Sequence, residues 1–182
     1  FPWTESSTTR IYPLEDPKID MALRIRLIRQ AKKNILISSF EHHLDSKVGL
    51  PILAALREAA ERQVKVRYVT SAFTSLLYDT SGLMNTLLAD LALPSPIKLL
   101  QFGGFMNPKK GLNFTDSMHE KILLIDEGYE NSVAFIGGRN FGDNYLDWLD
   151  FAAIVRDFSE NGALMKQIKK SFNYLWFDAA GL

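Results

Sequence analysis

The sequence predicts a single α/β domain in which helices cover both faces of a mixed β-sheet, an α/β/α sandwich. Its 182 residues suffice for one domain with a substantial core, and 47% of them are hydrophobic. Short apolar runs of strand character alternate with longer segments of helical periodicity, which is typical of this class. The charged residues balance to zero net charge, so binding to nucleic acid or anionic lipid would need a local patch.

Two absences narrow the kinds of site that the chain can carry. It contains no cysteine, which excludes disulfides and thiolate metal sites. No apolar run is long enough to span a bilayer. The sequence starts at Phe1 and not at Met, and we therefore expect a processed protein or a piece of a longer one.

The first half of the sequence predicts a strand–helix–strand unit. Residues 1–17, polar and with three prolines, read as an irregular lead-in, and residues 18–34 follow with helical spacing. The apolar run 35–40 predicts a strand, 49–63 a second helix and 64–70 a second strand. Strands joined by a helix of this length are parallel, and the crossover is right-handed.

The middle of the sequence predicts one more crossover and then a hairpin. Residues 81–93 read as a helix, 97–102 as a third parallel strand, and 103–117 as a loop. The apolar runs 118–125 and 132–138 are separated by a short polar turn, which is typical of a β-hairpin.

The end of the sequence predicts a last strand over 150–157 and an amphipathic helix over 161–177. We find no internal repeat and expect one domain over residues 1–182. The apolar side of the last helix consists of Leu164, Ile168, Phe172 and Leu175.

The predicted strand 118–125 carries the chemistry. Side chains alternate along a strand, so His119 and Lys121 share one face, about 7 Å apart. Folding the hairpin about its turn places His119 opposite Gly138 or Arg139.

The residues around this pair predict a phosphate pocket. Gly137 and Gly138 leave room for the imidazole and let the backbone approach a bound group, and Asn140 can donate an amide N–H. Lys121 and Asn140 would hold non-bridging oxygens, while His119 would act as nucleophile or proton donor. The alternative is a packed or surface histidine without a catalytic function.

This pattern resembles the signature of the phospholipase D superfamily. The segment "GGRNFGDNYLDW" is most similar to the bacterial cardiolipin synthase branch. The resemblance covers most of the chain, including "AKKNILISSF" and "LREAAERQVKVRYV". The motif residues that carry it are His119, Lys121, Asp126, Gly137, Gly138 and Asn140.

The resemblance implies phosphodiester chemistry without metal or cofactor, at a site where two such motifs meet. One histidine attacks phosphorus to form a phosphohistidine; the other protonates the leaving alcohol and then activates water or a second alcohol. It makes His119 the nucleophile or the acid, and Lys121 and Asn140 the groups that stabilise charge on phosphorus.

The resemblance also includes two aspartates and one departure. Asp126 belongs to the motif, but strand parity sends it to the face opposite His119, so we expect it to support the structure. Asp150 stands where family members place an acidic partner for the histidine. Glu120 replaces an arginine that is frequent in the synthase branch, on the face away from the site.

The second motif is missing from this sequence. His42 and His43 have no lysine two positions on, and we expect them to be exposed loop histidines. A metal site built from them would have only Glu41 and Asp45 nearby, and we discount it. The missing motif would come from another half of a longer chain or from the partner in a symmetric homodimer.

Three functions remain open. The first is a phospholipid transferase or hydrolase, bacterial, with peripheral membrane contact and a membrane-associated full-length form; the second is a homodimeric nuclease; the third is a catalytically silent phosphate-binding or assembly module. The Gly-Gly pair, where single-motif nucleases carry Gly-Ser, counts against the second. Loop residues Phe105, Met106, Lys109 and Lys110 would meet lipid, whereas the helix residues Arg24, Arg26, Arg29, Lys32 and Lys33 would meet nucleic acid.

Overall fold

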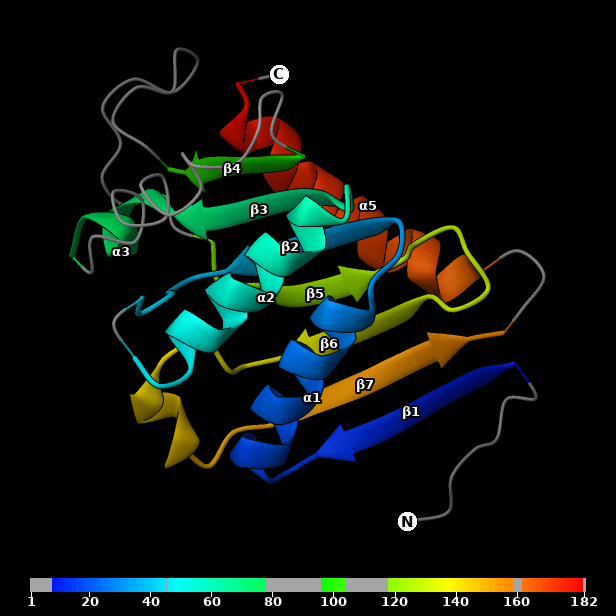
Figure 1. Ribbon diagram of the computed structural model, residues 1–182, viewed down its shortest axis with the longest axis horizontal. Coiled ribbons are helices and arrows are strands. Elements are labelled where there is room, and N and C mark those ends of the chain that lie inside the picture. The colour runs from blue at the N-terminus through cyan, green and yellow to red at the C-terminus, as the bar shows by residue number, and fades with distance from the viewer. Residues whose placement is uncertain (1–7, 45, 78–95, 104–117, 159–161, 182) are drawn as a thin grey trace.

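A mixed seven-stranded sheet separates two helical layers in the computed structural model (Figure 1). Helices α1 (Pro17–Gln30) and α2 (Gly49–Glu61) cover one face, and α5 (Ala163–Ala179) covers the other. The predicted α/β/α architecture is confirmed. The structure describes residues 8–44, 46–77, 96–103, 118–158 and 162–181.

The order of the strands across the sheet is β1-β7-β6-β5-β2-β3-β4. Strands β2, β3 and β4 are parallel to one another, whereas β5, β6, β7 and β1 join by antiparallel pairs. The predicted parallel pairing of these three strands and the β5–β6 hairpin are therefore confirmed. The bounds are β1 Thr9–Leu14, β2 Asn34–Ser39, β3 Lys65–Ser71, β4 Ile97–Phe102, β5 Lys121–Ile125, β6 Val133–Gly137 and β7 Ala152–Asp157, with short helices α3 Ala72–Leu77 and η1 Asp143–Leu146.

The prediction of an irregular lead-in was wrong for residues 9–14. They form the edge strand β1, which pairs with β7 from Thr9↔Asp157 to Leu14↔Ala152. Proline is tolerated in an edge strand, where one side of the backbone needs no partner, so Pro13 did not exclude a strand. The predicted helix 81–93 and residues 104–117 of the predicted loop lie outside the described residues.

Helix α1 begins with a side-chain cap and contains a buried ion pair. The carboxylate of Asp16 accepts hydrogen bonds from the backbone N–H groups of Lys18 (2.8 Å) and Ile19 (3.2 Å). One turn on, Arg24 Nε lies 2.7 Å from Asp20 Oδ1, and both side chains are fully buried. The sequence analysis placed Arg24 among the helix residues that would meet nucleic acid, but its buried side chain is not available for this.

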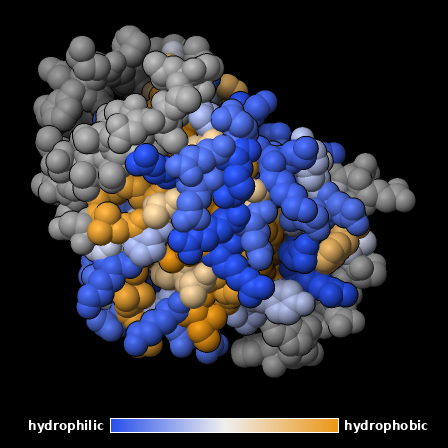
Figure 2. All heavy atoms as spheres, in the orientation of Figure 1, coloured by the Kyte–Doolittle hydropathy of each residue, from blue (hydrophilic) through white to orange (hydrophobic). Residues whose placement is uncertain are grey.

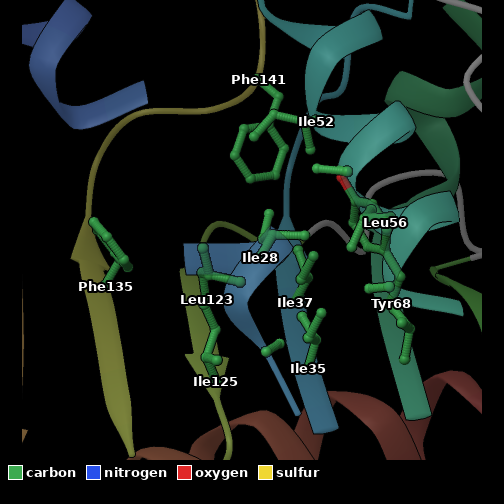
Figure 3. Close-up of a cluster of buried hydrophobic side chains, with 14 of the residues drawn as sticks. Ile28, Ile35, Ile37, Ile52, Leu56, Tyr68, Leu123, Ile125, Phe135 and Phe141 are labelled. Carbon is green, nitrogen blue, oxygen red and sulfur yellow. The ribbon is translucent and has the colours of Figure 1, made fainter. Parts of the chain in front are cut away.

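Two hydrophobic clusters hold the three layers together. The cluster under α5 includes Phe172 and Trp176, whose rings stack 6.0 Å apart. The larger cluster lies between the sheet and helices α1 and α2 (Figure 3). Together the two clusters exclude water from a sheet that is apolar on both faces. Labelled members of the larger cluster are Ile28, Ile35, Ile37, Ile52, Leu56, Tyr68, Leu123, Ile125, Phe135 and Phe141.

Candidate active site

The sequence motif gathers at one edge of the sheet, where β2 and β6 end and β5 begins, on the left in Figure 1. Because β5 runs antiparallel to both neighbours, its first residues lie beside their last ones: Lys121 pairs with Gly137, and Ile122 with Ser38. The connections that leave this edge carry most of the remaining candidate residues.

His119 and Lys121 lie together against the ring of Phe40. The centroid of the Phe40 ring lies 5.3 Å from the imidazole centroid of His119 and 5.4 Å from Lys121 Nζ. Lys121 Nζ also donates a hydrogen bond of 2.7 Å to the carbonyl oxygen of His119. His119 is exposed, whereas Lys121 is only 4% exposed. The site thus offers an accessible imidazole beside a shielded ammonium.

The strand that contains Lys121 is shorter than predicted. The sequence predicted a strand from Met118, but β5 begins at Lys121. Its partner β6 ends at Gly137, which pairs with Lys121, and the N–H of the next residue, Gly138, bonds to the carbonyl of Phe151. His119 therefore lies just before the ladder.

Burial lowers the pKa of Lys121 to about 8 from its usual 10.5. The nearby carboxylates of Asp150 and Glu41 oppose this change, because they stabilise the ammonium. Lys121 is therefore still charged at neutral pH, in surroundings where a bound anion would add to its stabilisation.

The amide of Asn140 has a fixed orientation. Its Oδ1 accepts a hydrogen bond of 3.2 Å from the backbone N–H of Glu41, a group that can only donate. The hydroxyl of Ser39 lies 3.4 Å from the same oxygen. Asn140 is 3% exposed, and these contacts leave its Nδ2 as the atom that can donate to a ligand.

The two glycines make room for the chain that precedes β7, and not for His119 as the sequence suggested. A Cβ on Gly137 would overlap the backbone of Phe151 and Ala152, and a Cβ on Gly138 would overlap the carboxylate of Asp150. The absence of a side chain at Gly138 thus lets the Asp150 carboxylate lie near Lys121, where it stabilises the charged ammonium. This position suits an acidic partner in the site.

Arg139, between the glycines and Asn140, anchors this segment inside the protein. Its guanidinium donates to the carbonyl oxygens of Leu14 (2.9 Å), Glu15 (2.8 Å) and Asp150, and lies 3.4 Å from Asp20 Oδ2. Arg139 is 1% exposed. It therefore ties the start of β7 to the β1–α1 connection and fixes the backbone of Asp150.

Glu41 lies in the candidate site, although the sequence had suggested it only as a neighbour of a discounted metal site. Its Oε2 accepts hydrogen bonds from the hydroxyl of Tyr145 and from His43 Nε2, the latter at 3.1 Å. Its carboxylate also acts on the charge of Lys121. The available signal was its place after β2, since loops that follow parallel strands often line sites.

Asp126 lies at the opposite end of β5 from Lys121. Its carboxylate accepts hydrogen bonds from the backbone N–H groups of Lys32, Lys33 and Asn34, at 2.7 to 3.2 Å. It therefore closes the α1–β2 connection and does not approach His119. This geometry agrees with the supporting role that strand parity predicted.

The prediction that His42 and His43 are exposed was wrong. His42 is completely buried, and its ring bonds to the Tyr68 hydroxyl (2.8 Å) and to the Gly49 carbonyl (3.0 Å). Burial lowers the pKa of His42 to about 4, a change that the bond to Gly49 opposes. The side chain of His43 is 17% exposed beside Glu41. No group of three His, Asp or Glu side chains suited to a metal occurs in the described ranges.

The family profile described as cardiolipin synthase, PLD-like domain, matches residues 24–176, which include every motif residue at this edge. The chain belongs to the phospholipase D superfamily. An uncharacterised Helicobacter pylori protein is 31% identical over 179 residues, which cover 90% of this chain and 32% of that protein. A Geobacillus kaustophilus cardiolipin synthase is 27% identical over 161 residues, covering 78% of this chain and 28% of the synthase. This phospholipase D-like chain thus spans about a third of these relatives.

Solved structures of the superfamily share the fold. Nuc from Salmonella typhimurium, a phospholipase D family member, superimposes with a TM-score of 0.69 at 17% identity, over 93% of this chain and 95% of Nuc. Phosphatidylserine synthase from Haemophilus influenzae gives a TM-score of 0.71 at 14% identity, over 91% of this chain but 37% of the synthase. The fold therefore occurs both as nearly a whole chain and as part of a longer one.

Proposed function

We propose that this chain is one half of a phosphodiesterase or phosphatidyltransferase that acts on phospholipids. The observation that carries the proposal is the convergence of His119, Lys121, Asn140 and Asp150 at one sheet edge, with the Lys121 ammonium buried but charged at neutral pH. These groups are those that an anionic phosphorus centre needs: a nucleophile or acid, and donors for its oxygens.

In the first step of the proposed reaction, an imidazole nitrogen attacks phosphorus while the P–O bond to the leaving alcohol breaks. His119 is exposed and reaches a substrate, and Lys121 and Asn140 Nδ2 stabilise the charge on the non-bridging oxygens. Asp150 stabilises the imidazolium. The leaving alkoxide takes a proton from a second histidine.

In the second step, water or an acceptor alcohol replaces the imidazole. Its O–H proton passes to the second histidine, a P–O bond forms and the N–P bond breaks, so the acid and the nucleophile are both regenerated. The second histidine comes from another motif-bearing half, either in a longer polypeptide or in a partner copy. The fraction of the relatives that this chain spans supports the longer polypeptide.

The surface beside the site suits such a second half. Trp148 and Phe151 are each 55% exposed, Leu149 is fully exposed, and all three flank Asp150 in the sequence. Figure 2 shows hydrophobic residues at the surface at its lower left, where Figure 1 has the short, unlabelled, dark-yellow helix η1. Apolar side chains that protrude next to an incomplete site are stabilised when a partner covers them.

The family comparison supports lipid over nucleic acid. The matching profile describes cardiolipin synthase, and a cardiolipin synthase is among the relatives. The helix face that a nuclease would use has less free positive charge than its sequence indicates, because Arg24 is buried against Asp20 and Arg29 pairs with Glu58. Contact with the membrane is proposed as peripheral; no helix in the described ranges is long and apolar enough to cross a bilayer.

The test is an assay of the full-length polypeptide against vesicles of phosphatidylglycerol and against single-stranded DNA. We expect turnover of the lipid, and loss of at least two orders of magnitude in the His119→Ala and Lys121→Ala variants. Lys170→Ala, which removes an exposed lysine from α5, is the matched control and keeps full activity. Turnover of DNA alone would replace the lipid proposal with a nuclease, and turnover unchanged in His119→Ala would exclude the proposed site.

A further inference from the structure

Two carboxylates act on the buried ammonium of the candidate site. Asp150 lies against Gly138, next to the Gly137 that pairs with Lys121, and Glu41 directly follows Phe40, whose ring is 5.4 Å from Lys121 Nζ. Both carboxylates stabilise the charged form of Lys121. The proposed reaction uses Asp150 as the partner of the histidine, but it contains no step for Glu41. A negative charge placed in a pocket for anions calls for an explanation, because it weakens the binding of any anion.

Glu41 is held firmly in this place. Its carboxylate, 14% exposed, accepts hydrogen bonds from Tyr145 and His43. Its backbone N–H donates to Asn140 Oδ1, and its carbonyl accepts a bond of 2.6 Å from the Ser39 hydroxyl. Both the backbone and the side chain are thus fixed, so the charge cannot swing away from Lys121 when a ligand enters.

The effect of the fixed Glu41 charge on binding depends on the charge of the ligand. A phosphodiester carries one negative charge, whereas a phosphomonoester carries about 1.5 to 2 at neutral pH. Repulsion from a fixed carboxylate grows in proportion to the ligand charge. The groups that face the ligand are Lys121 and His119 on the strand side, Asp150 before β7, and Glu41 with its neighbour His43 after β2. With two carboxylates beside a single ammonium, the site has no surplus positive charge to balance the second negative charge of a dianion.

We propose that Glu41 makes this site selective for phosphodiester monoanions over phosphomonoester dianions. The proposal rests on the proposed function, since it requires the phosphate to bind beside Lys121. It also accounts for product release: hydrolysis of a phosphodiester leaves a monoester, and the gain of negative charge drives that product away from Glu41.

The test compares two anions with the wild-type chain and with Glu41→Gln, which keeps the size and an acceptor oxygen but removes the charge. Dimethyl phosphate is the monoanion and sulfate the dianion, at pH 6.5, where Lys121 with its pKa of about 8 is charged. Binding is followed through the NMR signal of the Lys121 side chain. In the variant, we expect sulfate affinity to rise relative to dimethyl phosphate affinity by a factor on the order of ten.

Two controls separate charge from structure. Tyr145→Phe removes a hydrogen bond to Glu41 but keeps its charge, so the ratio of the two affinities stays as in the wild type. Glu58→Gln removes an equivalent carboxylate that pairs with Arg29 at the surface, and both affinities stay unchanged. Glu41→Asp, which keeps the charge, retains the wild-type preference.

The outcomes distinguish the selectivity from the site itself. If both anions shift Lys121 but their affinity ratio is the same in the wild type and Glu41→Gln, the role of Glu41 is overturned and the phosphate site stands. If neither anion shifts Lys121 in either protein, the phosphate site fails and the selectivity with it. Should Glu41→Gln not fold, the wild type alone decides: tighter binding of sulfate than of dimethyl phosphate overturns the proposal.

Discussion

The ammonium of Lys121 donates a 2.7 Å hydrogen bond to the backbone carbonyl of His119. One of its three N–H donors is thereby used inside the motif, and the other two remain for neighbours or a ligand. The bond also joins the first residue of β5 to the residue whose imidazole is accessible. The two residues of the motif are therefore fixed relative to each other before any ligand arrives.

We expect anion binding to weaken as pH rises through about 8, because burial brings the pKa of Lys121 to that value. An ordinary exposed lysine would keep its charge to about pH 10.4. Sulfate, whose charge is constant over this range, is the suitable ligand for a titration from pH 6 to 10. Lys121→Arg stays charged throughout and should lose this pH dependence, whereas Lys170→Ala should keep it. A constant sulfate affinity up to pH 10 in the wild type would contradict this expectation.

Two substitutions of Asn140 should separate the hydrogen bond of its oxygen from the donor function of its amide. Asn140→Asp keeps an oxygen for the backbone N–H of Glu41 but lacks the amide donor and adds a buried negative charge, so sulfate affinity falls at least tenfold and some stability is lost. Asn140→Ala leaves that buried N–H without its acceptor and lowers the free energy of unfolding by about 1 to 3 kcal/mol. Urea denaturation combined with sulfate titration measures both. An Asp variant that binds sulfate as the wild type does would remove Asn140 from the site.

Asp126→Asn should affect stability and leave the site intact. The residue has a φ of 51°, a conformation that Asn also tolerates, so the backbone is not strained by the change. The substitution weakens the hydrogen bonds from the backbone N–H groups of Lys32, Lys33 and Asn34, and we expect a loss of about 1 to 3 kcal/mol in unfolding free energy. Sulfate affinity should be unchanged. A loss of affinity at full stability would place Asp126 in the site after all.

The fold was predictable because its signals are local. Alternating and continuous apolar runs predicted the strands, and residues such as Ile168 and Phe172 marked the buried side of the last helix. The strand β1 was missed because the three prolines of residues 1–17 suggested a loop, and its pairing with β7 joins residues far apart in the sequence. No local pattern distinguishes an edge strand of this kind from an irregular segment.

The site was predictable only where the motif itself carries it. His119, Lys121 and Asn140 follow from the spacing, but Glu41 depends on Tyr145, which lies 104 residues away. In the same way, the burial of His42 depends on Tyr68 of the neighbouring strand. Contacts between distant segments decide these side chains, so the sequence alone could place them near the site but could not give their partners.

Arg139→Met should be the most destabilising change near the site. Removal of its guanidinium takes this donor from three carbonyl groups and leaves Asp20 paired with Arg24 alone, and we expect a cost of about 3 to 5 kcal/mol. Arg29→Met, which breaks an exposed pair with Glu58, should cost less than about 1 kcal/mol. Urea denaturation of the two variants gives the comparison. Equal effects would mean that Arg139 does not anchor the start of β7.

A phosphate group that binds between His119 and Lys121 should be visible in an NMR titration of the chain with inorganic phosphate. We expect the side-chain signals of both residues to shift along one binding curve with a single dissociation constant, and the Lys121→Ala variant to abolish the shift of His119. If the two signals follow different curves, or do not move while phosphate shifts residues elsewhere, phosphate does not bind between these residues.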